Sequence, residues 1–421
     1  MSLGPPPDLW RNAPFLRLWA AQTVSLSGSA VTKVALPLVA VTLLNLTPHQ
    51  MGLLLAVEIA PTLLLRLPAA AWADASSRHV PVMAACNLLS GLLITAIPVL
   101  WWMGLLSFGV LLGTAFCLTS VSAIGGMFAA PLLSAVVGDG QLVEANGRFG
   151  VTRNLADVSG RSLGGVLVSV LSAPVALFVD AASFMVAAGL TMAVRVPRKP
   201  RHDLARDTAS VKGLTLGFSL LLQRPFLGLG LGIVGYLCLA NGVVSALLVL
   251  FMSEHLGMSP SLIGPILGVG SVGGIIASLL VGAFHRRLGA QRTLAMAVAT
   301  LTGSFALLPL ARPGALGLLA CLNYELMGSF GASLLLITLF AEVPRQVPSN
   351  ALARVMAVVS LMPEVSTMLG AILGGTLGAS LGVPRTFAVS FVFALLSGTA
   401  LVLGLAWRRR LVLKRQAMVG G

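Results

Sequence analysis

The sequence predicts an all-α polytopic membrane protein, with twelve transmembrane helices arranged as two six-helix halves of related sequence. Hydrophobic residues make up 57% of the 421 residues and charged residues only 10%, whereas a soluble domain carries far more charge. Twelve apolar stretches are long enough to cross a bilayer, which takes ~20 residues per helix. The second half of the chain repeats motifs of the first half, which indicates two halves that cross the membrane in the same orientation.

The twelve stretches are expected to be helices, because in lipid every backbone polar group must be hydrogen-bonded inside its own segment. In chain order they are residues 15–44, 51–73, 80–101, 105–136, 149–172, 174–194, 226–253, 260–284, 291–311, 315–340, 353–381 and 385–407.

The main interruption of this pattern lies at residues 195–224, which begin with a basic and proline-broken stretch. Apolar residues then recur at helical spacing between Val211 and Leu222, with polar residues among them. We therefore expect an amphipathic helix on the cytoplasmic surface. The segment joins an N-terminal half, residues 1–194, to a C-terminal half with a basic tail, residues 225–421.

The internal repeat is clearest where residues 160–179 align without a gap on residues 370–389. Three glycines of each half coincide there: Gly160, Gly164 and Gly165 fall on Gly370, Gly374 and Gly375. Glycines at this spacing let helices in lipid approach closely, so these six residues are the expected helix-packing motif. Earlier in the chain, Pro48 and Gly52 match Pro260 and Gly264 in the same way.

The net charge of +14 is explained better by membrane topology than by nucleic-acid binding. With the N-terminus placed inside, 21 of the 27 Lys and Arg residues fall in the inner loops, the linker and the tail, and only Arg312 and Arg385 fall outside. This is the positive-inside pattern, and a basic inner face also suits anionic lipid head groups. We expect a monomeric, multi-pass protein of the cytoplasmic (inner) membrane, with both termini in the cytoplasm and no nucleic-acid partner.

The four cysteines and five histidines are scattered along the chain and show no metal-ligand spacing. No nucleophile, base and acid converge either, so we expect no metal site, no cofactor and no catalytic residues. Residues 268–273 match a dinucleotide-binding fingerprint with Gly268, Gly270 and Gly273. They lie inside an apolar run of membrane length, so helix packing is their expected role.

The loop after residues 51–73 carries a motif in which an acid is followed four residues later by basic residues. Asp74 and Arg78 occupy these positions. The second half repeats the motif from Gly282 to Gly289, with Arg286 where the acid would be and Arg287 after it. This pattern resembles the signature loop of the major facilitator superfamily. The resemblance implies that Asp74 helps to lock the cytoplasmic side in one conformation; the alternative is an ordinary solvated turn residue.

Residues 156–165 resemble the exporter-associated motif Gly-Pro-x-x-Gly-Gly, with Arg161 in place of the proline. Together with the start of the chain and residues 180–184, they resemble the branch of the superfamily that holds macrolide-efflux and enterobactin-export proteins. The resemblance covers nearly the whole chain and implies a central cavity lined by the first, fourth, seventh and tenth helices. The expected lining residues are Met127, Phe128, Phe251, Met252, Asn323 and Tyr324.

Nine charged residues lie away from the ends of the expected spans, and a charge near mid-bilayer costs ~2.5–3.5 kcal/mol. They are Lys33, Glu58, Arg66, Arg153, Asp157, Arg161, Asp180, Glu325 and Glu364. The spacing of Arg153, Asp157 and Arg161 places them on one helix face as an ion-paired ladder. Lys33 and Glu58 lie at similar depth and are expected to pair.

Glu325 and Glu364 lie near the expected midplane without an obvious partner in their own helices. A carboxylate in such surroundings can exchange protons near neutral pH. We therefore expect Glu325, Glu364 and Asp157 to couple proton movement to transport. Salt bridges across the two halves, such as Arg66 with Glu364, are the alternative.

These features together predict a secondary active transporter that works by alternating access. The expected activity is proton-coupled export, by antiport, of an amphipathic or hydrophobic small molecule of the drug, antibiotic or siderophore type. A lysolipid flippase or an importer on the same fold, and a membrane scaffold or sensor that transports nothing, are the alternatives. No enzyme activity is expected.

Overall fold

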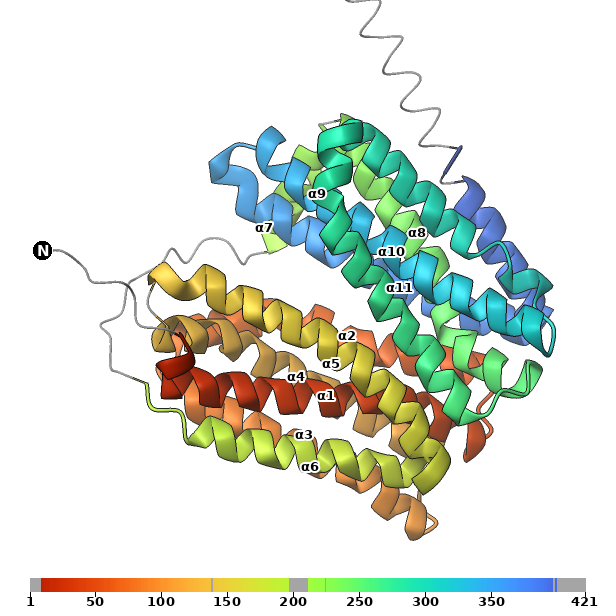
Figure 1. Ribbon diagram of the computed structural model, residues 1–421, viewed down its shortest axis with the longest axis horizontal. Helices are drawn as coiled ribbons and strands as arrows, with labels where there is room; N and C mark the ends of the chain where they lie inside the picture. Colours follow the sequence, from red (N-terminus) through yellow and green to blue (C-terminus); the bar gives the residue numbers. More distant parts are fainter. Residues whose placement is uncertain (1–8, 138, 197–210, 224, 397, 400–421) are drawn as a thin grey trace, which may run out of the picture. The chain divides into compact units, whose positions relative to one another are not determined.

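The computed structural model of the protein describes residues 9–137, 139–196, 211–223, 225–396 and 398–399 (Figure 1). Within these ranges the chain folds into helices joined by loops and contains no strand, which confirms the expected all-α fold. Half of the linker and the end of the last expected span, from residue 400 onwards, lie outside the described residues.

The six expected spans of the first half are six helices. They are α1 (Ala13–Thr42), α2 (Pro48–Ala75), α3 (His79–Trp102), α4 (Phe108–Val136), α5 (Leu142–Leu171) and α6 (Ala173–Met192). Thr47 and Gln50 form a capping box at the start of α2, and Ser107 accepts a hydrogen bond from the Val110 N–H at the start of α4. Such caps satisfy backbone donors that lack a partner within the helix, so they fix where these helices begin.

The second half follows the same plan. After α7 (Val211–Leu222), which lies in the linker, come α8 (Pro225–Leu250), a π-helical turn (Phe251–His255), α9 (Pro260–Ser304), α10 (Ala315–Gln346) and α11 (Ser349–Leu381), followed by a shorter apolar helix, Val383–Leu396. α9 contains two expected spans, which meet at Gly289. This residue has a φ of 75°, a conformation that favours glycine, so α9 consists of two helices joined by a kink.

Nine helices within the described residues are long and apolar enough to cross a membrane, against twelve expected spans. α5 is absent from the nine because it carries Arg148, Arg153, Asp157 and Arg161. The two parts of α9 count as one helix, and the described part of the last helix is short.

The chain divides into two compact units. Unit 1 comprises Met1–Ala209 and Val249–Gly268, and unit 2 comprises Ser210–Leu248 and Val269–Gly421. The π-helical turn and the first turns of α9 therefore group with the first six helices, although the sequence places them in the second half.

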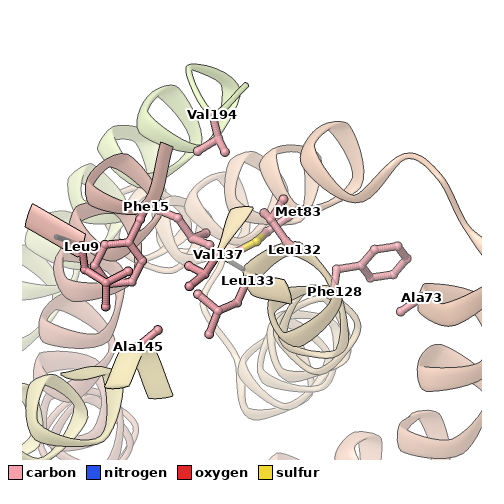
Figure 2. Close-up of a cluster of buried hydrophobic side chains, with 11 residues drawn as sticks. Leu9, Phe15, Ala73, Met83, Phe128, Leu132, Leu133, Val137, Ala145 and Val194 are labelled. Atoms are coloured by element: carbon pink, nitrogen blue, oxygen red, sulfur yellow. The ribbon is translucent and has the colours of Figure 1, made fainter. Parts of the chain in front are cut away.

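In unit 1, α1 packs against α5 and α6, α3 packs against α4 and α6, and α2 packs against α4. A hydrophobic cluster joins the helices at the end where α1 begins (Figure 2). Each of the six helices, or the residue next to it, contributes a side chain; the cluster consists of Leu9, Phe15, Leu18, Ala73, Met83, Phe128, Leu132, Leu133, Val137, Ala145 and Val194. Removal of this apolar surface from water ties one end of the six helices together.

The expected amphipathic helix is α7, which packs against α11 in unit 2. Leu221 is 1% exposed, whereas Leu216 and Phe218 are 47% and 42% exposed. One side of α7 is therefore covered by the unit, and other apolar side chains stay uncovered, as expected for a helix at a membrane surface.

The internal repeat reappears as the same close packing in both units. Gly160 on α5 lies against α1, where an added Cβ would lie 2.7 Å from Ser27 O and 2.5 Å from Ala30 Cβ. Gly370 on α11 lies in the same manner against the backbone of Leu239 on α8. In each unit the aligned glycine lets the corresponding pair of helices touch through their backbones.

The next aligned glycines repeat this contact one turn further along. An added Cβ on Gly164 would lie 3.1 Å from Val31 Cα, and one on Gly374 would lie 2.7 Å from Val243 Cα. Gly165 packs against the start of α9, because an added Cβ on Gly165 would lie 2.6 Å from the Cα of Gly264.

Candidate functional site

An ion cluster joins α1 to α5 inside unit 1. Lys33 Nζ lies 3.0 Å from Asp157 Oδ1, and Arg161 Nη2 lies 3.0 Å from Asp157 Oδ2. Asp157 therefore bridges two cations, one from the neighbouring helix and one from the next turn of its own helix. The three groups together carry one positive charge when all are ionised.

The cluster lies far from the ends of its helices. Lys33 precedes the last residue of α1 by about nine residues, or ~13 Å along the axis, and Asp157 lies near the middle of α5. The side chains are nevertheless not closed off, since Lys33 is 59% exposed, Asp157 23% and Arg161 27%.

The observed pairing differs from the expected one in two ways. Arg153 is exposed and makes no ion pair in the part of the chain that the structure describes. The expected ladder along α5 is therefore a pair, Asp157–Arg161, with Lys33 of α1 as its third member. Lys33 was expected to pair with Glu58; its ion pair is with Asp157 of α5, and Glu58 lies within electrostatic reach of it.

A buried carboxylate lies next to this cluster. Thr32 donates a hydrogen bond to Asp180 Oδ2 on α6, and Ser183 Oγ donates to Asp180 Oδ1 over 3.0 Å. Asp180 is 1% exposed. Gly28 leaves room for it, because an added Cβ there would lie 2.5 Å from Asp180 Oδ1. Consecutive residues of α1, Thr32 and Lys33, thus hold carboxylates from two different helices.

Unit 2 contains a neutral polar cluster between α8 and α10. Tyr324 donates its hydroxyl proton to Asn241 Oδ1 over 2.8 Å, and the hydroxyl of Ser245 lies 3.4 Å from that of Tyr324. Asn323 points elsewhere and donates to the backbone oxygen of Ser304 over 3.0 Å. Tyr324 is 4% exposed, so its polar end is satisfied inside the helix packing. Asn241 was not among the expected site residues, although an amide inside an apolar run of membrane length is a detectable signal.

Glu325, the residue after Tyr324, lies against α9. Its Oε2 occupies the space that an added Cβ on Gly270 would fill. An added Cβ on Gly273 would likewise collide with the backbone of Leu326 on α10. The Gly268–Gly273 stretch therefore packs helices together, and Gly270 in particular makes room for a carboxylate.

Three other expected charges are half-buried: Glu58 and Arg66 on α2, and Glu364 on α11. Arg66 belongs to unit 1 and Glu364 to unit 2. The salt bridge between them thus stays a prediction.

The first signature loop connects α2 to α3. Asp74 is exposed in the last turn of α2, and Arg78 donates its backbone N–H to Ser76 Oγ over 3.1 Å. His79 Nε2 lies 3.1 Å from Ala73 O. Asp74 makes no ion pair with Arg78 among the described residues, so the loop is held by its backbone and by His79.

The second signature loop carries an ionic cluster that the sequence analysis did not single out. Arg345 Nη1 lies 2.8 Å from Glu342 Oε1 on α10, and His285 Nε2 on α9 lies 3.5 Å from the same oxygen. Gly282, Arg286 and Arg287 are exposed. The Glu342–Arg345 spacing of three in a helix is the signal that could have revealed the pair.

Three of the expected lining residues are fully covered by other side chains. Phe128, Phe251 and Met252 are each 0% exposed, and Phe128 belongs to the hydrophobic cluster in Figure 2. Met127 is partly buried against the same cluster. We therefore correct Phe128, Phe251 and Met252 to core residues. Apolar composition alone cannot tell which side of a membrane helix its neighbours cover.

Comparison with known proteins identifies the class. Both units contain helices of membrane length, and α1 and α5 carry ion pairs midway along their length. These features are typical of a polytopic membrane protein with a polar interior. The chain belongs to the Major Facilitator Superfamily, a family of membrane transporters whose model matches residues 18–362. No curated protein matches the sequence.

Several solved transporters share the fold. The nucleoside transporter NupG is 13% identical with a TM-score of 0.76, and the match covers 93% of this chain and 98% of that one. A bacterial homologue of the iron transporter ferroportin is 17% identical with a TM-score of 0.72, over 93% and 98%. A bacterial homologue of the human lysosomal transporter Spinster is 16% identical with a TM-score of 0.70, over 95% and 98%. At these identities the likeness establishes the fold alone, and the expected macrolide-efflux and enterobactin-export branch stays a prediction.

Proposed function

We propose that the protein is a secondary active transporter of the cytoplasmic membrane that exports an amphipathic or hydrophobic small molecule in exchange for protons. The observation that carries the proposal is the ion cluster Lys33–Asp157–Arg161, which lies midway along α1 and α5 with Lys33 59% exposed. The protein acts as a monomer, and its two six-helix halves rock about a central site.

The exposure of Lys33 supports a path for water and solutes. A charged side chain at this depth is costly against lipid, and such residues face the bundle interior or a water-filled space. Lys33 and Arg161 are paired through Asp157 but retain exposed surface. A solute that enters between the helices therefore meets this cluster.

The carboxylates have different roles in this proposal. Asp157 is neutralised by two cations, so we assign it as the counter-ion that holds Lys33 and Arg161. Glu325, half-buried against Gly270, and Glu364 on α11 are the proposed proton carriers. Because Glu325 lies on α10 next to the Tyr324–Asn241 hydrogen bond, a change in its charge would act on the contact between α8 and α10.

An exposed apolar side chain on α10 suits the body of an amphipathic molecule. Met327 on α10 is 38% exposed. A flexible thioether accommodates apolar ligands of different shape. We further propose that the two signature loops, with Asp74 and Arg78 in one and Arg286 and Arg287 in the other, control opening on the cytoplasmic side.

The test is efflux from a bacterial host that lacks its own drug pumps. Cells that express the protein are expected to accumulate less of at least one compound in a panel of amphipathic dyes and antibiotics, and a protonophore is expected to abolish the difference. Lys33→Ala should lose the effect, whereas Arg153→Ala, a control that removes an exposed and unpaired cation of α5, should keep it. Equal accumulation of every compound, with the protein present in the membrane, would reject the proposal.

A further inference from the structure

We propose that Lys33 and Arg161 form an anion-binding subsite, so that the exported molecule is an amphipathic anion: a carboxylate, sulfonate or phosphate attached to an apolar body. This inference rests on the proposed transport function and specifies its substrate class.

The charges around the cluster favour an anion on its exposed side. Lys33 is the exposed cation there, and Arg161 is partly exposed. Asp157 is the one carboxylate in contact with them within the described chain. Cations therefore outnumber acids on this side of α1 and α5.

Few other charged groups pack around the cluster. α4 contains no charged residue, and the start of α9 that packs against α5 contains none up to Gly268. Asp180 of α6 is closed off at 1% exposure by Thr32 and Ser183. Glu58 of α2 is the remaining acid, half-buried and within electrostatic reach of Lys33.

Both cations keep donors for a ligand. A lysine ammonium carries three donors and an arginine guanidinium five. Lys33 uses one contact to Asp157, and its side chain is more than half exposed. Arg161 binds Asp157 through Nη2, and its buried Nε has no hydrogen-bond partner among the described residues. Lys33 therefore has donors that a carboxylate or phosphate oxygen can bind.

Binding is an exchange of counter-ions. The ligand's anionic group contacts Lys33 in place of Asp157 Oδ1, and Asp157 Oδ2 stays paired with Arg161. No charge is left without a partner before or after the exchange, which avoids the large cost of an isolated charge inside a membrane protein. Export of an anion is also favoured by an inside-negative membrane potential, which at the same time drives protons inward.

The experiment uses two fluorescent probes that differ in charge alone. Dansyl-phenylalanine carries a carboxylate at neutral pH, and its amide is uncharged. Binding to the full-length protein in lipid nanodiscs is measured by energy transfer from tryptophan, with empty nanodiscs as the baseline. The wild-type protein is expected to bind the acid about tenfold more tightly than the amide, which corresponds to ~1.4 kcal/mol.

The variants assign this preference to the cluster. Lys33→Gln should bind acid and amide equally, while Arg153→Gln, which removes a cation one turn from Asp157 without breaking an observed ion pair, should keep the preference. Asp157→Asn should strengthen binding of the acid, because it removes the competing carboxylate. If Lys33→Gln does not fold, Arg161→Gln is used in its place and should likewise lose the preference for the acid over the amide. Lys33→Arg, which keeps the charge, should retain that preference.

Equal binding of acid and amide by the wild-type protein, failure to bind the acid, or equal effects of Lys33→Gln and Arg153→Gln would overturn the inference. Proton-driven flux, measured in liposomes with the same preparation, separates the two proposals. A preference for the acid without flux would reject the transport function but keep the subsite. Flux without that preference would reject the subsite but keep the function.

Discussion

Lys33 on α1 and Asp157 on α5 form an ion pair of 3.0 Å between two helices that Gly160 brings into backbone contact. The short distance depends on the glycine, because a side chain at this position would hold the helices apart. The packing motif and the charged site are therefore parts of one arrangement, and each can be tested separately.

Gly160→Ala is expected to destabilise the protein. Its Cβ would lie 2.5 Å from Ala30 Cβ and 2.7 Å from the backbone oxygen of Ser27, and overpacking of this kind costs ~1–3 kcal/mol. Gly150→Ala is the matched control on the same helix, since no atom lies within 4 Å of its added Cβ and alanine favours helix by up to ~1 kcal/mol. Thermal unfolding in detergent measures both. Gly370→Ala should resemble Gly160→Ala, and a Gly160→Ala protein as stable as Gly150→Ala would contradict the packing argument.

Asp180 is expected to stabilise the contact between α1 and α6. Asp180→Ala removes the acceptor for the hydroxyls of Thr32 and Ser183, and loss of a buried hydrogen-bond partner costs ~1–3 kcal/mol. Thr32→Val keeps the side-chain shape and removes one of these donors. In a double-mutant cycle by thermal unfolding, the two changes together should cost less than their sum. Full additivity would show that this hydrogen bond contributes nothing to stability.

Glu325→Gln is expected to uncouple transport from protons. The amide keeps the shape that Gly270 accommodates but cannot carry a proton charge. In liposomes, flux of an exported compound driven by a pH gradient should fall at least about tenfold, which is ~1.4 kcal/mol, while exchange at equal pH continues. Glu254→Gln, an exposed acid in the π-helical turn, is the control. Unchanged gradient-driven flux in Glu325→Gln would remove Glu325 from the coupling scheme.

The membrane orientation is predicted to place both termini in the cytoplasm. His49 lies in the first turn of α2 and Ser77 in the loop between α2 and α3, and both are exposed. In a background without the native cysteines, an impermeant maleimide added to intact cells should label His49→Cys but spare Ser77→Cys. The reverse pattern would invert the topology that the distribution of Lys and Arg predicts.

Much of the fold follows from the sequence because lipid restricts the choices. Apolar stretches of membrane length must be helices, and the aligned Gly160 and Gly370 already indicated equivalent helix contacts in the two halves. The partner of Lys33 could not be predicted, because depth along a helix says nothing about which neighbouring helix faces it. Phe128 shows the same gap: its residue type fits a binding surface and a core equally well. Its 0% exposure and its ring contacts with Trp72 and His79 decide for the core.

The most direct test of the account is the reactivity of Lys33→Cys toward a charged, water-soluble thiol reagent, in a background without the native cysteines. Alternating access through a path lined by Lys33 predicts modification from outside in intact cells and also from the cytoplasmic side in inverted vesicles. Leu92→Cys on α3 is the control, since Leu92 is 63% exposed in an apolar stretch of the helix, and it should stay unmodified from either side. Modification of Lys33→Cys from one side alone, or from neither, would contradict a site that opens in turn to both sides of the membrane.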